Sequence, residues 1–331
     1  MEPDKEQTAQ RLYDENLITD KELADVKAYR SLGIFSLHNE LQFLLYASVL
    51  LFTAGAGIVI YKNIDTIGHT IILALLLAVC VGCYYCCFKK SPGFSPEEIS
   101  FDNPVYDYLV LLATILSCIF IGYLQFQYHP FGSHLSVPTY ISAFIALASA
   151  YYFDNRSALS IGITGLAAAI GITITPQALL ENHFFENPAL FYYGIALGLL
   201  LIVWTEYSER TQIKNHFALI FICFAQHLIG ICSLTGMVGD FWFRYAFFLA
   251  ASTVYFYWKS HRLRSTTVFV FVLLYAYIGF NILLFRAIML IEAYEIFELI
   301  TLVSPVYVIG LIFLFIRSIR QFNRKTNDSA E

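Results

Sequence analysis

Charged residues are scarce in this chain of 331 residues. Only 14% are Asp, Glu, Lys or Arg, whereas 58% are hydrophobic and 17% aromatic. An average soluble domain carries about 25% charged and about 45–50% apolar residues, and a chain of this length cannot hide so much apolar surface from water. The composition therefore argues against a soluble enzyme and against a disordered protein. It predicts a protein that is surrounded largely by lipid.

Other absences narrow the function classes further. No block of Lys and Arg is long enough to follow a phosphate backbone, and the net charge is −5, so we expect no nucleic-acid partner. Residues 1–40 hold fourteen charged residues and no opening apolar run, so we expect no cleavable signal peptide. No Gly-rich phosphate loop, HExxH or GxSxG motif occurs. We therefore name no catalytic residue and no cofactor.

The seven cysteines all lie inside apolar runs, which argues against a disulfide framework. Four of them end one run: Cys80, Cys83, Cys86 and Cys87. Thiolates can bind a soft metal, but a tetrahedral site usually needs two separated ligand pairs. Because these four cysteines fall on one expected helix, we interpret them as packing residues and expect no metal site.

What the sequence does contain is a succession of apolar runs. A bilayer core of about 30 Å needs about 20 helical residues. Ten runs meet this need approximately: 41–61, 67–88, 104–126, 137–153, 157–175, 188–205, 215–235, 241–258, 265–285 and 303–318. The predicted fold class is all-α, a polytopic integral membrane bundle of about ten transmembrane helices. The fourth and fifth runs are separated only by residues 154–156, which suits a tight helical hairpin.

Two features qualify this span prediction. Residues 287–302 are apolar but carry Glu292, Glu295 and Glu298 in one stripe, so we interpret them as an interfacial or re-entrant helix before the last span. The prolines avoid span centres, and Pro305 is placed at a span start. Mostly unbroken helices weaken one sign of an ion-coupled transporter.

The distribution of Lys and Arg predicts the topology. With both termini in the cytoplasm, seventeen of these residues fall on the cytoplasmic side, and only Lys62 and Arg286 fall on the external side. Arg244 is left over, one turn inside the eighth span. This bias supports an even number of spans. The first partner that we expect for such a protein is the lipid bilayer.

Residues 1–38 are expected to form a cytosolic helical hairpin with amphipathic character. Thr19 and Glu22 have the spacing of a capping box at a helix start. The transmembrane bundle then covers residues 39–320, and residues 321–331 form a cytosolic tail. The segment 1–38 could recruit a cytosolic protein partner, or it could be a solvated leader that merely abuts the membrane.

Small residues indicate which helices lie inside the bundle. The fifth span consists mainly of Ser, Gly, Ala and Thr between Ile and Leu, so we expect it to be buried among other helices. Gly194 and Gly198 form a GxxxG pattern in the sixth span. This pattern could pack internally or form the face of a homo-oligomer.

Polar groups near the predicted outer ends of the spans are the candidate site residues, because polar side chains in a bilayer are costly. They are Asn63, Asp65, His69, Gln125, Asp240, Arg244, Asn281 and Arg286. If these helix ends converge, the residues would line an outward-facing substrate pocket. They could instead be loop residues in headgroups and water, and Asp240 with Arg244 could be a local ion pair. His227, near the middle of the seventh span, could relay protons or be a neutral, hydrogen-bonded histidine.

Three stretches resemble one known family. They are LYDENLITDKELADVKAY, GAGIVIYKNIDTIGHTIILALLLAV and SAFIALASAYYFDNRSALSIGITGLAAAIG. The chain resembles, over roughly residues 10–175, the bacterial membrane-protein family catalogued as domain of unknown function 2157. Asn63 matches the Asn of the first short loop, but Ile64 stands where the family usually has Trp. The resemblance implies a multi-pass protein of the inner (cytoplasmic) membrane and no particular activity.

Three functions remain open at this point. The first is a non-catalytic membrane component, such as a scaffold, sensor or assembly factor, with residues 1–38 as its recognition module. The second is a transporter of small solutes or lipids, although the two halves of the chain show no convincing similarity. The third is a membrane-embedded enzyme acting on lipid-linked substrates, for which the sequence offers no nucleophile or metal set.

Overall fold

The computed structural model describes residue 19 and residues 38–101, 103–174, 188–290 and 296–328. The chain divides into two compact units, Met1–Ile58 and Val59–Glu331. The described part of the first unit is mainly the beginning of helix α3 (His38–Ile67). The helical hairpin predicted for residues 1–38 falls outside the described residues, and so does its capping box except for Thr19.

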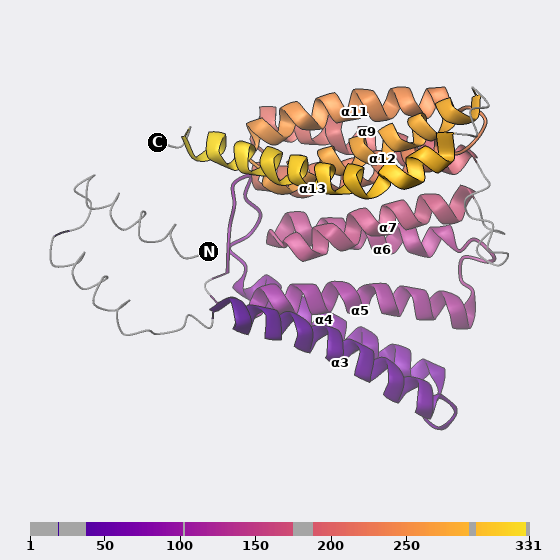
Figure 1. The fold of residues 1–331 in the computed structure, drawn as a ribbon. Coiled ribbons are helices and arrows are strands. Elements are labelled where there is room, and N and C mark those ends of the chain that lie inside the picture. The colour runs from indigo at the N-terminus through magenta and orange to yellow at the C-terminus, as the bar shows by residue number, and fades with distance from the viewer. Residues whose placement is uncertain (1–18, 20–37, 102, 175–187, 291–295, 329–331) are drawn as a thin grey trace. The chain divides into compact units, whose positions relative to one another are not determined.

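The described residues form ten α-helices and one short 3-10 helix, and they contain no strand (Figure 1). After α3, the elements are α4 (His69–Lys90), α5 (Val105–Tyr128), α6 (Ser136–Phe153), α7 (Arg156–Ile174), α9 (Pro188–Thr211), η1 (Asn215–Phe217), α10 (Ala218–Gly236), α11 (Trp242–Arg262), α12 (Thr266–Leu290) and α13 (Ile296–Asp328). Each predicted span coincides with one helix. The all-helical prediction is therefore confirmed.

Six helical segments are long and apolar enough to cross a membrane within the described part of the chain: α4, α5, α7, α9, η1 with α10, and α12. For α3, α6, α11 and α13, membrane crossing stays a prediction. In α11 the basic side chains of the last turn dilute an otherwise apolar helix.

The end of the chain differs from the predicted pattern. Residues 287–290 belong to α12, and α13 already begins at Ile296, so 296–302 are not a separate helix before the last span. Glutamate is a good helix former, and Glu298 alone does not interrupt the apolar run. Pro305 accordingly lies inside α13 rather than at a helix start, a position that membrane helices tolerate. Glu292 and Glu295 lie outside the described residues.

Neighbouring helices of the second unit pair as hairpins: α4 with α5, α6 with α7, α9 with α10, and α11 with α12. The predicted tight turn between α6 and α7 is confirmed, since Asp154 adopts a left-handed conformation (φ 60°) directly after α6 and only Asn155 separates it from α7. The side chain of Asn155 then caps α7, because its Oδ1 accepts the Ala158 N–H at 2.9 Å.

The main core is built by α6, α7 and α9–α12. It contains fully buried Leu159 and Ile163 of α7 together with Ile222 and Ala225 of α10. A Cβ on Gly165 would lie 3.0 Å from the Cβ of Ala143 in α6, so the small residues of α7 allow close approach, as predicted. These contacts fix the helix ends that carry the site.

The GxxxG pattern of α9 packs internally. A Cβ on Gly194 would meet Cys232, and one on Gly198 would meet Ile229, both on α10. Large apolar side chains on the opposite side of α9 remain exposed, including Leu200 and Val203 at 60% and 68%. Such a surface suits contact with lipid tails.

Candidate functional site

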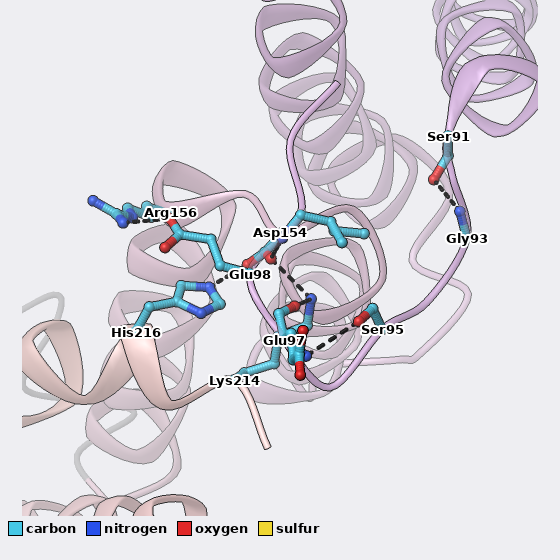
Figure 2. A network of polar contacts seen from close by, with 10 residues as sticks. Ser91, Gly93, Ser95, Glu97, Glu98, Asp154, Arg156, Lys214 and His216 are labelled. Atoms are coloured by element: carbon cyan, nitrogen blue, oxygen red, sulfur yellow. Dashed lines mark hydrogen bonds and ion pairs between the residues drawn. The ribbon is translucent and has the colours of Figure 1, made fainter. Parts of the chain in front are cut away.

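A buried cluster of charged groups lies where α6, α9 and the connection after α4 meet (Figure 2). The side chain of Asp154 is fully buried, and its Oδ2 lies 3.0 Å from the Nζ of Lys214. The same oxygen accepts the Ile99 N–H at 2.7 Å, and Oδ1 contacts Nε2 of His216. We call Asp154, Lys214 and His216, with the backbone they bind, the Asp154 cluster.

Lys214 is buried although it lies between two helices. Its backbone adopts a left-handed conformation (φ 52°) just before η1, which turns the side chain inward. Its N–H donates to the Pro96 carbonyl at 2.7 Å, and its Nζ donates to the Glu97 carbonyl at 3.3 Å. The ammonium also lies 5.6 Å from the ring centre of Phe94. Lys214 therefore binds the α4–α5 connection by both its backbone and its side chain.

Local hydrogen bonds shape that connection. The hydroxyl of Ser91 accepts the Gly93 N–H, and that of Ser95 accepts the Glu97 N–H, each at 3.1 Å. Such side-chain turns are typical of serine. Arg156 forms a 2.7 Å ion pair with Glu98, but both side chains are more than half exposed. The connection is thus held mainly by its buried contacts with Asp154 and Lys214.

A second charged group joins α9 to α11, and we call it the Lys259 cluster. The fully buried Nζ of Lys259 lies 2.5 Å from Glu206 Oε1 and 2.7 Å from Glu209 Oε1. Arg262 pairs with Glu209 at 3.1 Å. Tyr255 donates its hydroxyl to Glu206 at 2.8 Å. The Glu209 oxygens lie within ion-pair distance of Lys259 and Arg262 but form no hydrogen bond with suitable geometry.

Both clusters compensate their own charge. Removing a charge from water costs several kcal/mol even after relaxation, and a partner at close range offsets this cost. Asp154 faces Lys214, and the two glutamates of α9 face Lys259 and Arg262. The arrangement therefore fixes segments to one another, and its charged atoms are directed at each other rather than into a cavity.

The predicted outer residues fall into two groups. Nδ1 of His69 lies 2.7 Å from the Tyr123 hydroxyl, joining α4 to α5. Gln125 is buried and binds the loop after α5, donating to the Gly132 carbonyl at 2.8 Å and accepting the Phe131 N–H at 3.2 Å. The positions Asn63 and Asp65 lie in the last turns of α3, and their side chains are outside the described part.

The other four outer residues lie around the ends of α10, α11 and α12. The guanidinium of Arg286 donates to the carbonyls of Met237, Val238 and Gly239, which close the C-terminus of α10. Asn281 accepts the Tyr307 hydroxyl at 3.2 Å. Arg244 lies over the Phe241 ring at 4.7 Å.

These outer residues line different hollows. Gln125 lines one of about 520 Å³ between α5, α6 and α7, Asp240 lines one of about 460 Å³, and Asn281 with Arg286 lines one of about 720 Å³. One shared pocket of all the predicted residues is therefore not formed by the described side chains.

His227 is half-buried in α10. Its Nδ1 lies 2.8 Å from the Tyr275 hydroxyl of α12, and its ring contacts Phe271 edge-on. The neighbouring Gln226 donates to the Val268 carbonyl at 3.0 Å. Both side chains therefore join α10 to α12. Within the described residues, no group of three or more His, Cys, Asp and Glu is placed to hold a metal ion.

Sequence reasoning did not single out the two buried clusters. It used Lys214, Lys259 and Arg262 only as markers of the cytoplasmic side, and Asp154 only as part of a turn. A usable signal was present, because acidic residues recur beside basic ones at the same predicted membrane surface. The partners lie up to 117 residues apart in the chain, so their pairing depends on helix packing.

Comparison with known proteins gives one match. No curated protein and no solved structure matches the chain. The family model described as a predicted membrane protein, DUF2157, matches residues 10–159. The match includes Asp154 and the α4–α5 connection, whereas Lys214 and the Lys259 cluster lie beyond it. It confirms the resemblance inferred from the sequence, and over residues 10–159 the chain is similar to this family of predicted membrane proteins.

Proposed function

We propose that this protein is a non-catalytic component of the bacterial inner membrane that presents a fixed set of loops to the cytoplasm. The observation that carries the proposal is the Asp154 cluster. It ties the α4–α5 connection, the α6–α7 turn and the α9–α10 connection together through fully buried charges. A rigid surface at the helix ends suits a scaffold or assembly factor.

The same observation weighs against alternating access at this end of the bundle. Transporters expose a central site by moving one group of helices against another. Opening between α6 and α9 would separate Asp154 from Lys214 and break the bonds that both make to the α4–α5 connection, so these contacts oppose such a movement. The Lys259 cluster opposes separation of α9 from α11 in the same way.

Spin labels can test this rigidity. Labels introduced through a non-canonical amino acid at Ser100 and Arg210, both exposed, report the distance between the α4–α5 connection and α9. In lipid vesicles we expect one narrow distance distribution, which Asp154→Asn broadens. The matched control is Arg156→Gln, which removes only an exposed ion pair and leaves the distribution narrow. Two distance populations in the unaltered protein would contradict the proposal.

The charged N-terminal segment is the proposed site of partner recruitment. Residues 1–38 carry many charged side chains. In the cytoplasm, outside the bilayer, this segment would be accessible to a soluble protein partner. Cross-linking in cells followed by mass spectrometry should identify a partner of the full chain, and deletion of 1–38 should abolish that cross-link while membrane insertion persists. Retention of the partner after deletion would refute this role. Self-association, the other partner considered, would appear as cross-links between copies.

One observation favours the transporter as a second candidate. The hollow of about 460 Å³ at the predicted external end combines Asp240 with Phe191, Phe241 and Tyr245, a mixture able to bind a small polar or cationic solute. Solute binding or uptake in liposomes that Asp240→Asn abolishes and His227→Ala alters would support this function. Unaltered activity in both variants would remove these residues from any transport site.

A further inference from the structure

Helix α13 is longer than a bilayer core requires. It contains 33 residues, which correspond to about 50 Å at 1.5 Å per residue, against about 30 Å of hydrocarbon. Its exposed apolar residues extend to Ile316, and arginines follow at once. We call Arg317, Arg320 and Arg324 the arginine face. The helix thus passes from an apolar to a basic surface near a membrane boundary.

The arginine face is directed away from the bundle. Phe322 is buried and stacks on Phe269 of α12, with their ring centres 4.3 Å apart. The ring centre of His261 in α11 lies 4.9 Å from that of Phe322. At 3.6 residues per turn, the three arginines lie about 140–160° around the helix axis from Phe322. They are exposed, as are Ile309 and Phe313 on the preceding turns of the same side, at 68% and 66%.

The charge of this region favours an anionic occupant. Glu206 and Glu209, near the end of α11, already face Lys259 and Arg262. From Arg317 to Asp328, the sequence of α13 has four basic residues and one acidic residue. Guanidinium groups bind phosphate with high geometric complementarity, and basic residues directly beyond a membrane helix attract anionic lipids. The apolar side chains above the arginines provide contact for acyl chains.

We infer that the outer side of α13 binds an anionic phospholipid, whose phosphate contacts the arginine face and whose acyl chains lie along Ile309 and Phe313. A soluble acidic polypeptide would bind the same arginines. It would gain nothing from the exposed apolar side chains of Phe313 and Ile309, which lie one and two turns before Arg317. The inference is independent of the proposed scaffold function and of which membrane surface is cytoplasmic.

Native mass spectrometry of the full chain in mild detergent tests the inference. The probes are phosphatidylglycerol and phosphatidylcholine with identical acyl chains, added in equal amounts. We expect phosphatidylglycerol to be retained preferentially. The variant R317Q/R320Q/R324Q should reduce the ratio of bound phosphatidylglycerol to phosphatidylcholine by about tenfold or more.

A matched variant removes three charges elsewhere. Lys89→Gln, Lys90→Gln and Arg210→Gln delete exposed cations at the ends of α4 and α9, and this variant should keep the lipid preference. Circular dichroism verifies that both triple variants fold. Equal loss in the two variants would reveal a diffuse charge effect and overturn the site. Unchanged preference in the arginine variant, or binding of a polyglutamate peptide without preference for phosphatidylglycerol, would also overturn it.

Discussion

Asp154 and Lys214 are both buried, and the charge of each offsets the free-energy cost of removing the other from water. Replacing such a pair by apolar residues is often neutral, whereas removal of one member leaves a buried charge without compensation. Asp154 additionally accepts the Ile99 N–H and contacts His216. Its carboxylate therefore holds three segments together.

We expect Asp154→Asn to lower the free energy of unfolding by about 3–5 kcal/mol, because the Lys214 ammonium stays buried without a counter-charge. Lys214→Met should cost a similar amount, and the double variant should cost less than the sum. Unfolding followed by circular dichroism in mixed detergent micelles measures each value. Arg156→Gln, which breaks the exposed pair with Glu98, should cost well under about 1 kcal/mol. Additive losses in the double variant would show that the two residues do not interact.

The residue scale is also where the sequence was least informative. Hydropathy located Asp154 in a turn, and charge counting located Lys214 at a helix end. Neither pattern predicts that the two side chains lie close together in space. His69, Gln125 and Arg286 show the converse case. Their polarity near helix ends made them candidate site residues, whereas the structure places them in contacts within or between helices and loops. Polarity alone does not distinguish a loop-binding side chain from a ligand-binding one.

At the scale of single helices, prediction was accurate because one physical quantity dominates. A run of apolar residues long enough for a bilayer can satisfy its backbone only as a helix, so the predicted runs and the observed helices coincide. At the end of the chain, α13 begins seven residues before the predicted span and includes Glu298 and Pro305. The pairing of helices required packing detail, such as the contact of Gly198 with α10.

Gly198→Ala tests that helix contact. The added methyl group would lie 3.2 Å from the Ala225 carbonyl and overlap Ile229, so we expect a loss of about 1–3 kcal/mol from overpacking. Gly82→Ala is the matched control, since this glycine of α4 has nothing within 4 Å and alanine is the better helix former. Thermal unfolding in detergent should rank Gly198→Ala below the unaltered protein and Gly82→Ala at or above it. The reverse order would refute the packing of α9 on α10.

At the scale of the whole molecule, the buried clusters relate helix ends to one another. Asp154 and Lys214 contact each other and the α4–α5 connection, which places that connection beside the ends of α6 and α9. The Lys259 cluster adds the end of α11. Helix ends can meet in this way only if an even number of crossings separates them. The contacts therefore favour crossing by α6 and α11, although their own hydropathy does not place them among the six apolar spans.

Reporter fusions test this parity directly. Fusions of a fluorescent protein, active only in the cytoplasm, and a phosphatase, active only outside, should assign Ser100, Arg156, Gln212 and Arg264 to the cytoplasm and Gly132 and Gly239 to the exterior. The physical reason is the excess of Lys and Arg at the first set of ends. If α6 lies on the membrane surface instead, Gly132 and Arg156 will report the same side, and the same holds for Gly239 and Arg264 across α11. Either result would break the ten-span topology. The first would also be incompatible with the hydrogen bonds that join the α4–α5 connection to Asp154 and Lys214, and the second with the ion pairs of Lys259. A complete reversal of all six sites would keep the parity and the ion pairs but refute the predicted orientation.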